Sequence, residues 1–402
     1  MGYMFYSATS PPKLFTLILL SALSIVSLNL FVASLSNIAE EFQTDYALVN
    51  LAIAGYAGMT AVLLLIIGPL SDRFGRRPII IAGLVIFILA SLGCLLATDI
   101  STFLFFRLLQ GAIISGSVLS NAVVRDMVPA REAASKLGYL AMAWAVAPML
   151  GPVLGGVLDG LFGWRASFVT FAGLGVAILS LCWVDLGETN KTPSETFAKQ
   201  FETYPELLRS RRFWGYALCM AFSTGAFYAF LGGVPLVAKT MFGMSTASLG
   251  FYIGTITAGF LLGSYLSGRY ARRYSLTTMM IAGRIVACFG LVIGLVLFLS
   301  DVIHVFSLFG TCVFVGVGNG ITMPSSSAGA MSVRPKLAGS ASGLSGALTV
   351  LGGAVMASIT GALVTEQNGV YSLLGMMLFS SLMGLVAALY VLWVDQTDET
   401  GC

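Results

Sequence analysis

The stretch Gly68-Pro-Leu-Ser-Asp-Arg-Phe-Gly-Arg-Arg77 decides how the rest of this chain is interpreted. It forms a short charged connection between two long apolar runs, 47–70 and 79–97. Its glycines permit a tight turn, and Asp72 stands among three arginines with which a carboxylate can pair. A compact charged turn between two apolar runs of this length indicates a loop at a membrane surface.

Apolar runs of the same kind recur along the whole chain. A helix that spans a bilayer needs about 20 mostly apolar residues. Ten further runs meet this requirement: 14–36, 101–124, 135–158, 166–186, 213–239, 247–270, 278–299, 303–325, 337–362 and 370–394. They lack the two-residue alternation of β-barrel strands, and the first is too long for a signal peptide. The sequence therefore predicts an all-α membrane protein with twelve transmembrane helices.

The composition excludes most other classes of protein. Of 402 residues, 57% are hydrophobic and 10% are charged, whereas soluble domains carry about 25% charged residues. A net charge of +3, spread along the chain, is too small to indicate nucleic-acid binding. Six cysteines without a CxxC pair and a single histidine predict no metal site and no cofactor. We therefore expect a protein that is not an enzyme.

The basic residues divide unevenly between the two sides of the predicted membrane. We assign 17 of the 21 Lys and Arg residues to the N-terminal tail and the even-numbered connections. Arg165 and Lys239 fall on the other side, and Arg107 and Arg284 fall inside predicted helices. Because cytoplasmic loops carry the excess of Lys and Arg, we expect both termini in the cytoplasm and the protein in the bacterial inner membrane.

The chain divides near its midpoint into two similar halves. The longest polar connection, 187–212, separates six predicted helices in 1–186 from six in 213–402, and we expect it to be a cytoplasmic linker. Residues 70–77 have a counterpart of related sequence at 266–273, again after the second helix of a half. Duplicated six-helix bundles are typical of transporters, with a substrate site between the halves near the midplane.

The charged stretch at 68–77 resembles the loop signature of the major facilitator superfamily, in the place where that family has it. The resemblance implies a latch that holds the two halves in the outward-facing state. In it, Asp72 would face the start of helix eleven and Asp126 would pair with the loop arginines. The alternative is that the arginines only set the topology. The implied latch residues are Gly68, Asp72, Arg73, Gly75, Arg76, Arg77 and Asp126.

A second segment, Phe106-Arg-Leu-Leu-Gln-Gly111, resembles another motif of that family. A charged residue inside a membrane helix costs about 2.5–3.5 kcal/mol on insertion scales. Arg107 is therefore expected to face the bundle interior or a watery cavity, with Gln110 and Asn121 near the same helix face. The alternative is that Arg107 extends to the extracytoplasmic surface.

A third segment, Ala147-Pro-Met-Leu-Gly-Pro-Val-Leu-Gly-Gly156, resembles the helix-five signature of drug exporters in this superfamily. Its glycines permit close helix packing, and its prolines bend the helix. Ordinary small-residue packing is the alternative. Together the three segments resemble the twelve-helix drug:proton antiporter group, and within it the Bcr/CflA-like multidrug efflux branch. The helix-five residues concerned are Pro148, Gly151, Pro152, Gly155 and Gly156.

The chain departs from that branch in helix one. The branch carries an Asp that is taken to bind the coupling proton or a cationic drug, and the aligned residue here is Asn29. No carboxylate is predicted deep in any helix. A cavity that holds Arg107, Arg284 and the polar Asn319 should be neutral to positive, which favours a neutral or anionic substrate. Alternatively, Arg284 is structural and a carboxylate at the membrane boundary performs the coupling.

The resemblance predicts a monomeric transporter that exports a small drug-like molecule by alternating access and is coupled to protons. Its partners would be the small-molecule substrate, protons and the lipid bilayer. A rival within transport is an exporter of an endogenous anionic metabolite or siderophore, not necessarily proton-coupled. A rival outside transport is a membrane sensor built on the same fold.

Overall fold

The protein is almost entirely helical in the part that the structure describes. The computed structural model describes residues 12–128, 136, 140, 150–190, 204–270, 273–334 and 337–400. Within these ranges there is no β-strand, and eleven helical spans are long and apolar enough to cross a membrane. A shorter apolar helical segment, Leu150–Phe162, belongs to the predicted fifth span. The predicted all-α membrane fold is confirmed.

The N-terminal half contains two helices that are interrupted by short 3-10 turns. The predicted first span, 14–36, is not one continuous helix, because η1 separates α1 from α2. The interruption follows Asn29, whose side-chain amide donates to the carbonyl oxygen of Ile25 at 2.8 Å and so competes with the helix ladder. The elements are α1 (Leu14–Asn29), η1 (Val32–Ser34), α2 (Leu35–Glu41), α3 (Tyr46–Phe74), α4 (Arg76–Leu96), α5 (Ile100–Leu109), η2 (Gln110–Ile113), α6 (Ile114–Met127) and α8 (Arg165–Asp185).

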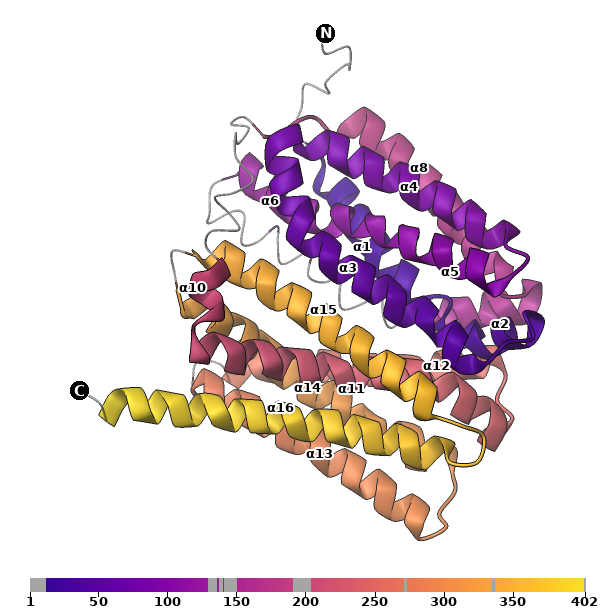
Figure 1. Cartoon of the computed structure of the whole chain (residues 1–402), viewed down its shortest axis with the longest axis vertical. Helices are drawn as coiled ribbons and strands as arrows, with labels where there is room; N and C mark the ends of the chain where they lie inside the picture. The colour runs from indigo at the N-terminus through magenta and orange to yellow at the C-terminus, as the bar shows by residue number, and fades with distance from the viewer. Residues whose placement is uncertain are drawn as a thin grey trace.

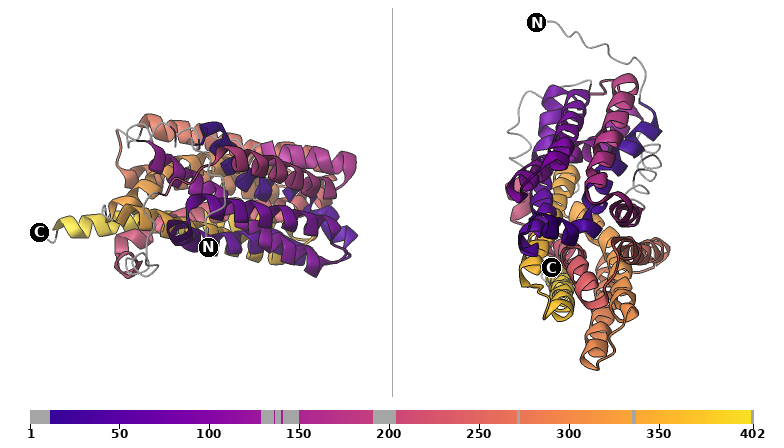
Figure 2. Two further views of the ribbon diagram at one scale, coloured as in Figure 1. Left: turned by 90° about the horizontal axis from the view of Figure 1, so that it is seen from above. Right: turned by 90° about the vertical axis from the view of Figure 1, so that its right-hand side faces the viewer.

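The C-terminal half is built of longer helices. Pro235 and Pro324 lie inside two of them, and the helix that contains Pro324 continues to Ser332, past the predicted end at 325. The elements are α10 (Tyr204–Leu208), α11 (Arg211–Phe242), α12 (Thr246–Tyr270), α13 (Leu276–Leu299), α14 (Val305–Ser332), α15 (Ala338–Leu363) and α16 (Gly369–Thr400). The right-hand view of Figure 2 shows the two halves on opposite sides of the molecule.

Local capping explains where several of these helices begin. Asp99 accepts a hydrogen bond from the backbone N–H of Thr102 at 2.9 Å, and its carboxylate also accepts from the Thr102 hydroxyl. These two hydrogen bonds, the side-chain one first, lower the pKa of Asp99. Ser210 and Ser275 cap α11 and α13 in the same way. Such caps satisfy donors that the first turn of a helix leaves free.

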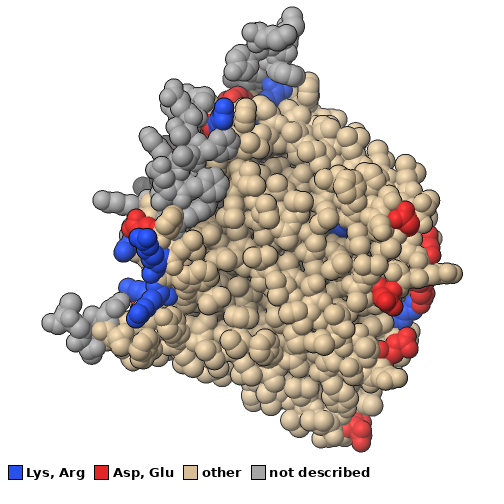
Figure 3. Space-filling model, viewed as in Figure 1, with Lys and Arg blue, Asp and Glu red and all other residues tan. Residues whose placement is uncertain are grey.

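The molecule has two ends with different charge. We call the end with α10 and the starts of α1 and α11 the terminal face, and the end with α2 and the 243–245 turn the opposite face. In Figure 3 most of the visible Lys and Arg side chains gather on the left, at the terminal face, and Asp and Glu on the right. The sides between them expose large apolar residues such as Leu96 and Val184, about three quarters exposed. An apolar outer belt of this kind suits lipid rather than water.

The two halves are joined most closely at the opposite face. Helix α3 packs along α15, and η1 and α2 reach α11 and α12. In Figure 1 the N-terminal helix α4 and the C-terminal helix α16 come closer to each other toward this end of the molecule. The boundary between the halves is therefore closed at the opposite face, and a cavity lies between the halves.

Candidate functional site

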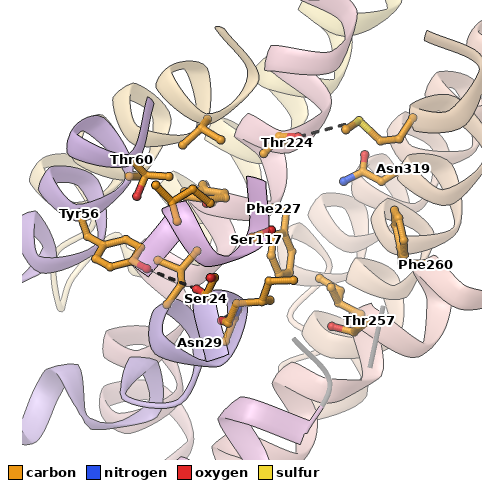
Figure 4. Close-up of a pocket in the computed structure, with 18 of the residues that line it drawn as sticks. Ser24, Asn29, Tyr56, Thr60, Ser117, Thr224, Phe227, Thr257, Phe260 and Asn319 are labelled. Atoms are coloured by element: carbon orange, nitrogen blue, oxygen red, sulfur yellow. Dashed lines mark hydrogen bonds between the residues drawn. The ribbon is translucent and has the colours of Figure 1, made fainter. Parts of the chain in front are cut away.

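A cavity of about 330 Å³ lies between the two halves. Helices α1, α3 and α6 line it from one side, and α11, α12, α14 and α15 line it from the other. Its wall is mostly apolar and includes the rings of Tyr56, Phe227, Tyr228 and Phe260 (Figure 4). Among the described residues that line it there is no charged side chain. A molecule held here would touch both halves at once.

Several polar groups of the cavity lining have no partner within the described protein. These are the Asn29 Oδ1 atom and the hydroxyls of Thr60, Ser117 and Thr257, all buried. Figure 4 shows these side chains distributed around the cavity. A buried polar group without a hydrogen bond costs about 1–3 kcal/mol. A ligand that offers hydrogen-bonding groups would recover part of this cost once these side chains rotate toward it, so the lining favours a molecule with both apolar and polar atoms.

Arg107 lies behind the cavity wall and is fully buried. Its guanidinium group lies 4.1 Å from the ring centre of Phe31 and 4.4 Å from that of Tyr56. It donates to the carbonyl oxygen of Ser27 at 2.7 Å and to Gln110 Oε1 at 2.5 Å. Complete burial rules out the alternative in which Arg107 extends to the membrane surface.

A chain of hydrogen bonds connects Arg107 with the cavity. Tyr56 lines the cavity, stacks on the arginine and forms a 2.6 Å hydrogen bond with the Ser27 hydroxyl. On the far side, Gln110 donates to the Ser91 hydroxyl at 2.7 Å. One tyrosine ring thus lies between the Arg107 guanidinium group and the cavity. The guanidinium group itself is not part of the cavity surface.

Arg284 occupies a similar position in the C-terminal half. It is fully buried and donates to Thr322 Oγ1 at 3.1 Å and to Asn319 Oδ1 at 2.6 Å. Asn319 lines the cavity and donates in turn to the carbonyl oxygen of Ser223 at 3.0 Å. Neither Arg284 nor Arg107 has an ion pair with a carboxylate among the described residues.

The six residues predicted for the cavity therefore separate into two groups. Asn29 and Asn319 belong to the lining. Arg107, Gln110 and Arg284 lie behind it, while Asn121 is half-buried and outside the lining. The predicted positive charge is present near the cavity but is not on its surface.

The loop at 68–77 forms a charged cluster at the terminal face. Arg76 pairs with Asp72 at 2.5 Å and with Asp126 at 3.2 Å. The Gly68 carbonyl oxygen accepts from the Ser71 hydroxyl at 2.8 Å, which tightens the end of α3. Arg73 is exposed and lies over the ring of Phe74. Both of these Arg76 ion pairs stay within the N-terminal half, and a latch to helix eleven stays a prediction.

Glu188, from the start of the linker, completes this cluster. Its carboxylate accepts the backbone N–H groups of Arg76 at 3.0 Å and Arg77 at 3.1 Å, where the N-terminus of α4 favours negative charge. Gly75 has φ +97°, and a Cβ there would lie 2.4 Å from Glu188 Oε2. Arg77 donates to the carbonyl oxygen of Trp183 at 3.0 Å. No spacing in the sequence connects Glu188 with this turn.

The glycines of the predicted helix-five motif lie at helix crossings. Gly151 and Gly155 lie against Asn29 and Leu30 of the first span. A Cβ on Gly156 would lie 2.2 Å from the carbonyl oxygen of Thr246, which begins α12. Gly156 therefore lies at the crossing between the halves, beside the neighbouring Pro152. Pro148 lies outside the described residues.

Three polar residues that were not predicted join the halves near the opposite face. Asn50 donates to the carbonyl oxygen of Ala357 at 2.5 Å, and Tyr46 donates to that of Gly232 at 2.8 Å. Lys239 reaches across to Glu40 and Asn37 on α2. The sequence signal that was available is an amide, Asn50, inside an apolar run. The structure shows that this amide is fully buried.

Two helical bundles around a central cavity, with many apolar spans, define a membrane transporter fold. The chain matches the sequence model of the Major Facilitator Superfamily over residues 17–357 and belongs to this family. It is 27% identical to multidrug resistance protein D of Escherichia coli, and the alignment covers 94% of each chain. It is 24% identical to a bicyclomycin resistance protein homolog of Haemophilus influenzae, with 87% of this chain and 88% of the relative covered.

Solved structures show the same fold. A bacterial homolog of the human lysosomal transporter Spinster, in an inward-facing and unoccupied conformation, has a TM-score of 0.73 and 17% identity, with 96% of each chain covered. The predicted resemblance to the Bcr/CflA-like drug-efflux branch is therefore confirmed at the level of family and relatives. The protein is a transporter of that family and not an enzyme.

Proposed function

We propose that this protein exports a small drug-like molecule by alternating access, in exchange for protons. The observation that carries the proposal is the central cavity, which both halves line and which contains no charged side chain among its described lining residues. A site shared by two bundles changes its access when the bundles rock against each other. The relatives that are named as drug-resistance proteins support export over import.

The proposal includes an orientation. We assign the terminal face to the cytoplasm, because the Lys and Arg residues gather there and cytoplasmic loops carry that excess. The hydrogen bonds from Tyr46, Asn50 and Lys239 then close the extracytoplasmic side. In this state the substrate would enter from the cytoplasm. The two six-helix units at 1–186 and 213–402 would move as the two bodies of a monomeric transporter.

The substrate that fits best is neutral, partly aromatic and equipped with hydrogen-bonding groups. Apolar walls with a few polar groups are typical of small-molecule sites, and Asn29 stands where a carboxylate would select cations. A second candidate is an endogenous anionic metabolite or siderophore. Arg107 and Arg284 favour it, because each is a buried positive charge without a carboxylate partner among the described residues.

Flux measurements on purified protein in proteoliposomes with an internal pH dye test these proposals. A phenicol and a polycarboxylate siderophore are the first compounds to add. Substrate-dependent proton movement supports antiport, whereas flux without proton movement removes proton coupling. Absence of flux for every neutral and anionic compound tested would contradict the proposed substrate classes.

A matched pair of variants separates the cavity from general effects on the bundle. Phe227→Ala removes a ring from the cavity wall, and Phe251→Ala removes one that is 62% exposed on the outer surface. We expect Phe227→Ala to reduce flux about tenfold, which corresponds to about 1.4 kcal/mol, and Phe251→Ala to leave it unchanged. Equal effects would contradict the assignment of the site.

A further inference from the structure

Asp159 differs from every other described carboxylate of this protein. It is 7% exposed, whereas the other Asp and Glu side chains whose burial the structure describes are half-buried or exposed. It lies near the end of the helical segment Leu150–Phe162, one turn beyond the crossing of Gly156 with Thr246. The one buried carboxylate of the described chain is therefore at the boundary between the halves, and it is not in the cavity lining.

The Asn37 amide connects Asp159 with the C-terminal half. Asn37 donates from Nδ2 to Asp159 Oδ2 at 2.7 Å. Through its Oδ1 atom the same side chain accepts from Lys239 Nζ at 3.3 Å. Because Lys239 belongs to α11 and Asn37 to α2, this bridge exists only while the halves are closed at the opposite face.

The charges around Asp159 do not balance. Lys239, from α11, is the cation that faces it, and this lysine also pairs with Glu40 of α2. Farther along α2, Glu41 is neutralised by Arg165 of α8. The hydroxyls of Ser34 and of Thr246 also lie beside the carboxyl group. With Asp159 ionised, two carboxylates share one ammonium group, so closure buries one unbalanced negative charge.

We propose that Asp159 is the proton-binding site through which protons drive closure of the opposite face. This inference rests on the proposed proton antiport. When the halves separate at this face, Lys239 and Thr246 leave with the C-terminal half and water reaches the carboxylate. A proton from that water binds a carboxylate oxygen of Asp159 and gives a neutral carboxylic acid, while Lys239 remains charged beside Glu40.

Protonation favours the closed state because of the cost of burial. Desolvation penalises a carboxylate far more than the neutral acid. A group that holds its proton more tightly in one conformation shifts the equilibrium toward that conformation as the pH falls. Proton binding from the extracytoplasmic side would thus return the emptied transporter to the state seen here. For Asp159 to supply the coupling that Asn29 cannot, its proton must then leave toward the cytoplasm, along the boundary between the halves, before the opposite face reopens.

Distances between spin labels across the opposite face test the proposal without any substrate. Leu48→Cys and Ser248→Cys, both exposed at the starts of α3 and α12, carry the labels in a Cys402→Ser background. The other five cysteines are buried. We expect the short-distance population to rise about threefold or more when the pH is lowered from about 8 to about 5. Wild-type distances that do not change with pH would overturn the proposal.

Two variants and a control locate the effect. Asp159→Asn keeps an acceptor for Asn37 and imitates the protonated acid, so it should show the short distance at every pH. Lys239→Gln removes the neighbouring ammonium group and should move the midpoint to higher pH. Glu366→Gln removes an exposed carboxylate of the same face and should respond as the wild type does. A pH response that persists in Asp159→Asn would refute the assignment.

Transport assays distinguish failure of this inference from failure of the proposed function. Asp159→Asn should exchange labelled for unlabelled substrate at a reduced rate that no longer depends on pH, because its opposite face opens rarely, and should lose accumulation driven by a pH gradient. Accumulation that survives in Asp159→Asn overturns the proton site and leaves the exporter intact. A pH-dependent distance change in a protein that moves no compound supports the proton site and overturns the exporter.

Discussion

Asn50 Nδ2 lies 2.5 Å from the carbonyl oxygen of Ala357 and joins α3 to α15 across the boundary between the halves. The amide is fully buried and fits against Gly361, one turn farther along α15. In the proposed alternating-access cycle, this fully buried hydrogen bond between the halves breaks whenever the opposite face opens. Asn50 is therefore placed to set the relative stability of the closed state, and its glycine neighbour is a means of testing this.

Gly361→Ala should open the opposite face. Its Cβ would lie 2.1 Å from Asn50 Nδ2 and 2.8 Å from Asn50 Cβ, so a rotation of the amide alone cannot relieve the clash. Overpacking of this kind costs about 1–3 kcal/mol. We expect labels at the opposite face to report a longer separation, as a distance distribution from pulsed electron paramagnetic resonance.

Gly346→Ala provides the matched control on the same helix. A Cβ at Gly346 would meet no atom within 4 Å. Replacing this helical glycine should leave the distance distribution unchanged and raise thermal stability slightly, by about 0.5–1 kcal/mol. Equal distance distributions in the two variants would show that the packing of Asn50 against Gly361 does not hold the halves together.

Arg107→Lys should reduce transport although it preserves the charge. The guanidinium group is planar and stacks between Phe31 and Tyr56 while it donates to two separate acceptors. A lysine ammonium is compact and strongly hydrated and cannot reproduce this geometry. Each lost charged hydrogen bond is worth about 1.5–3 kcal/mol. We expect a lower melting temperature in detergent and about a tenfold loss of flux.

Arg334→Lys is the corresponding surface substitution. Arg334 pairs with Glu206 at the terminal face, and both side chains are more than half exposed. An exposed pair contributes about 0–1 kcal/mol, so this variant should melt and transport as the wild type does. If Arg107→Lys behaved no differently from it, the buried stack would have no role beyond its charge.

The sequence was sufficient to predict the spans and the family but not the rotation of each helix. Runs of apolar residues define where a helix crosses the membrane, because the bilayer has a fixed thickness. Which side chain reaches the cavity depends on packing. Arg107 was expected near the cavity because charge is costly in lipid, yet the lining residue Tyr56 stands between it and the cavity.

Contacts between distant residues were the part that no local pattern revealed. Asn37 and Lys239 are 202 residues apart, and Glu188 reaches Arg76 from a separate connection 112 residues away. Neither pair has a characteristic spacing, since the fold alone brings the partners together. The 3-10 turn at Val32–Ser34 was missed for a related reason, because apolar composition is the same in a continuous and an interrupted helix.

Glu188→Gln should destabilise the terminal-face cluster. The carboxylate accepts two N–H groups at the start of α4, and the amide offers one oxygen and no charge. Loss of a cap of this kind costs about 0.5–2 kcal/mol. We expect a lower melting temperature and slower flux. Glu206→Gln, which disrupts an exposed pair with Arg334, should change neither by a comparable amount. Equal losses would argue against a capping role.

Asn29→Asp should change the charge preference of the cavity. Asn29 is 2% exposed, lines the cavity and has an Oδ1 atom without a partner in the described structure. A carboxylate at this place attracts cations strongly, because the surrounding wall is apolar and screens little. We expect the variant to gain export of ethidium by about tenfold over wild type, with weaker transport of neutral compounds.

Asn121→Asp shows whether the position of the charge matters. Asn121 is half-buried in the same half of the protein but lies outside the cavity lining. The same substitution there should leave ethidium efflux, measured by fluorescence in everted vesicles, at the wild-type level. Strong ethidium export by the wild-type protein would contradict the neutral-substrate proposal directly. A gain in both variants would mean that overall negative charge, and not the cavity wall at Asn29, selects the cation.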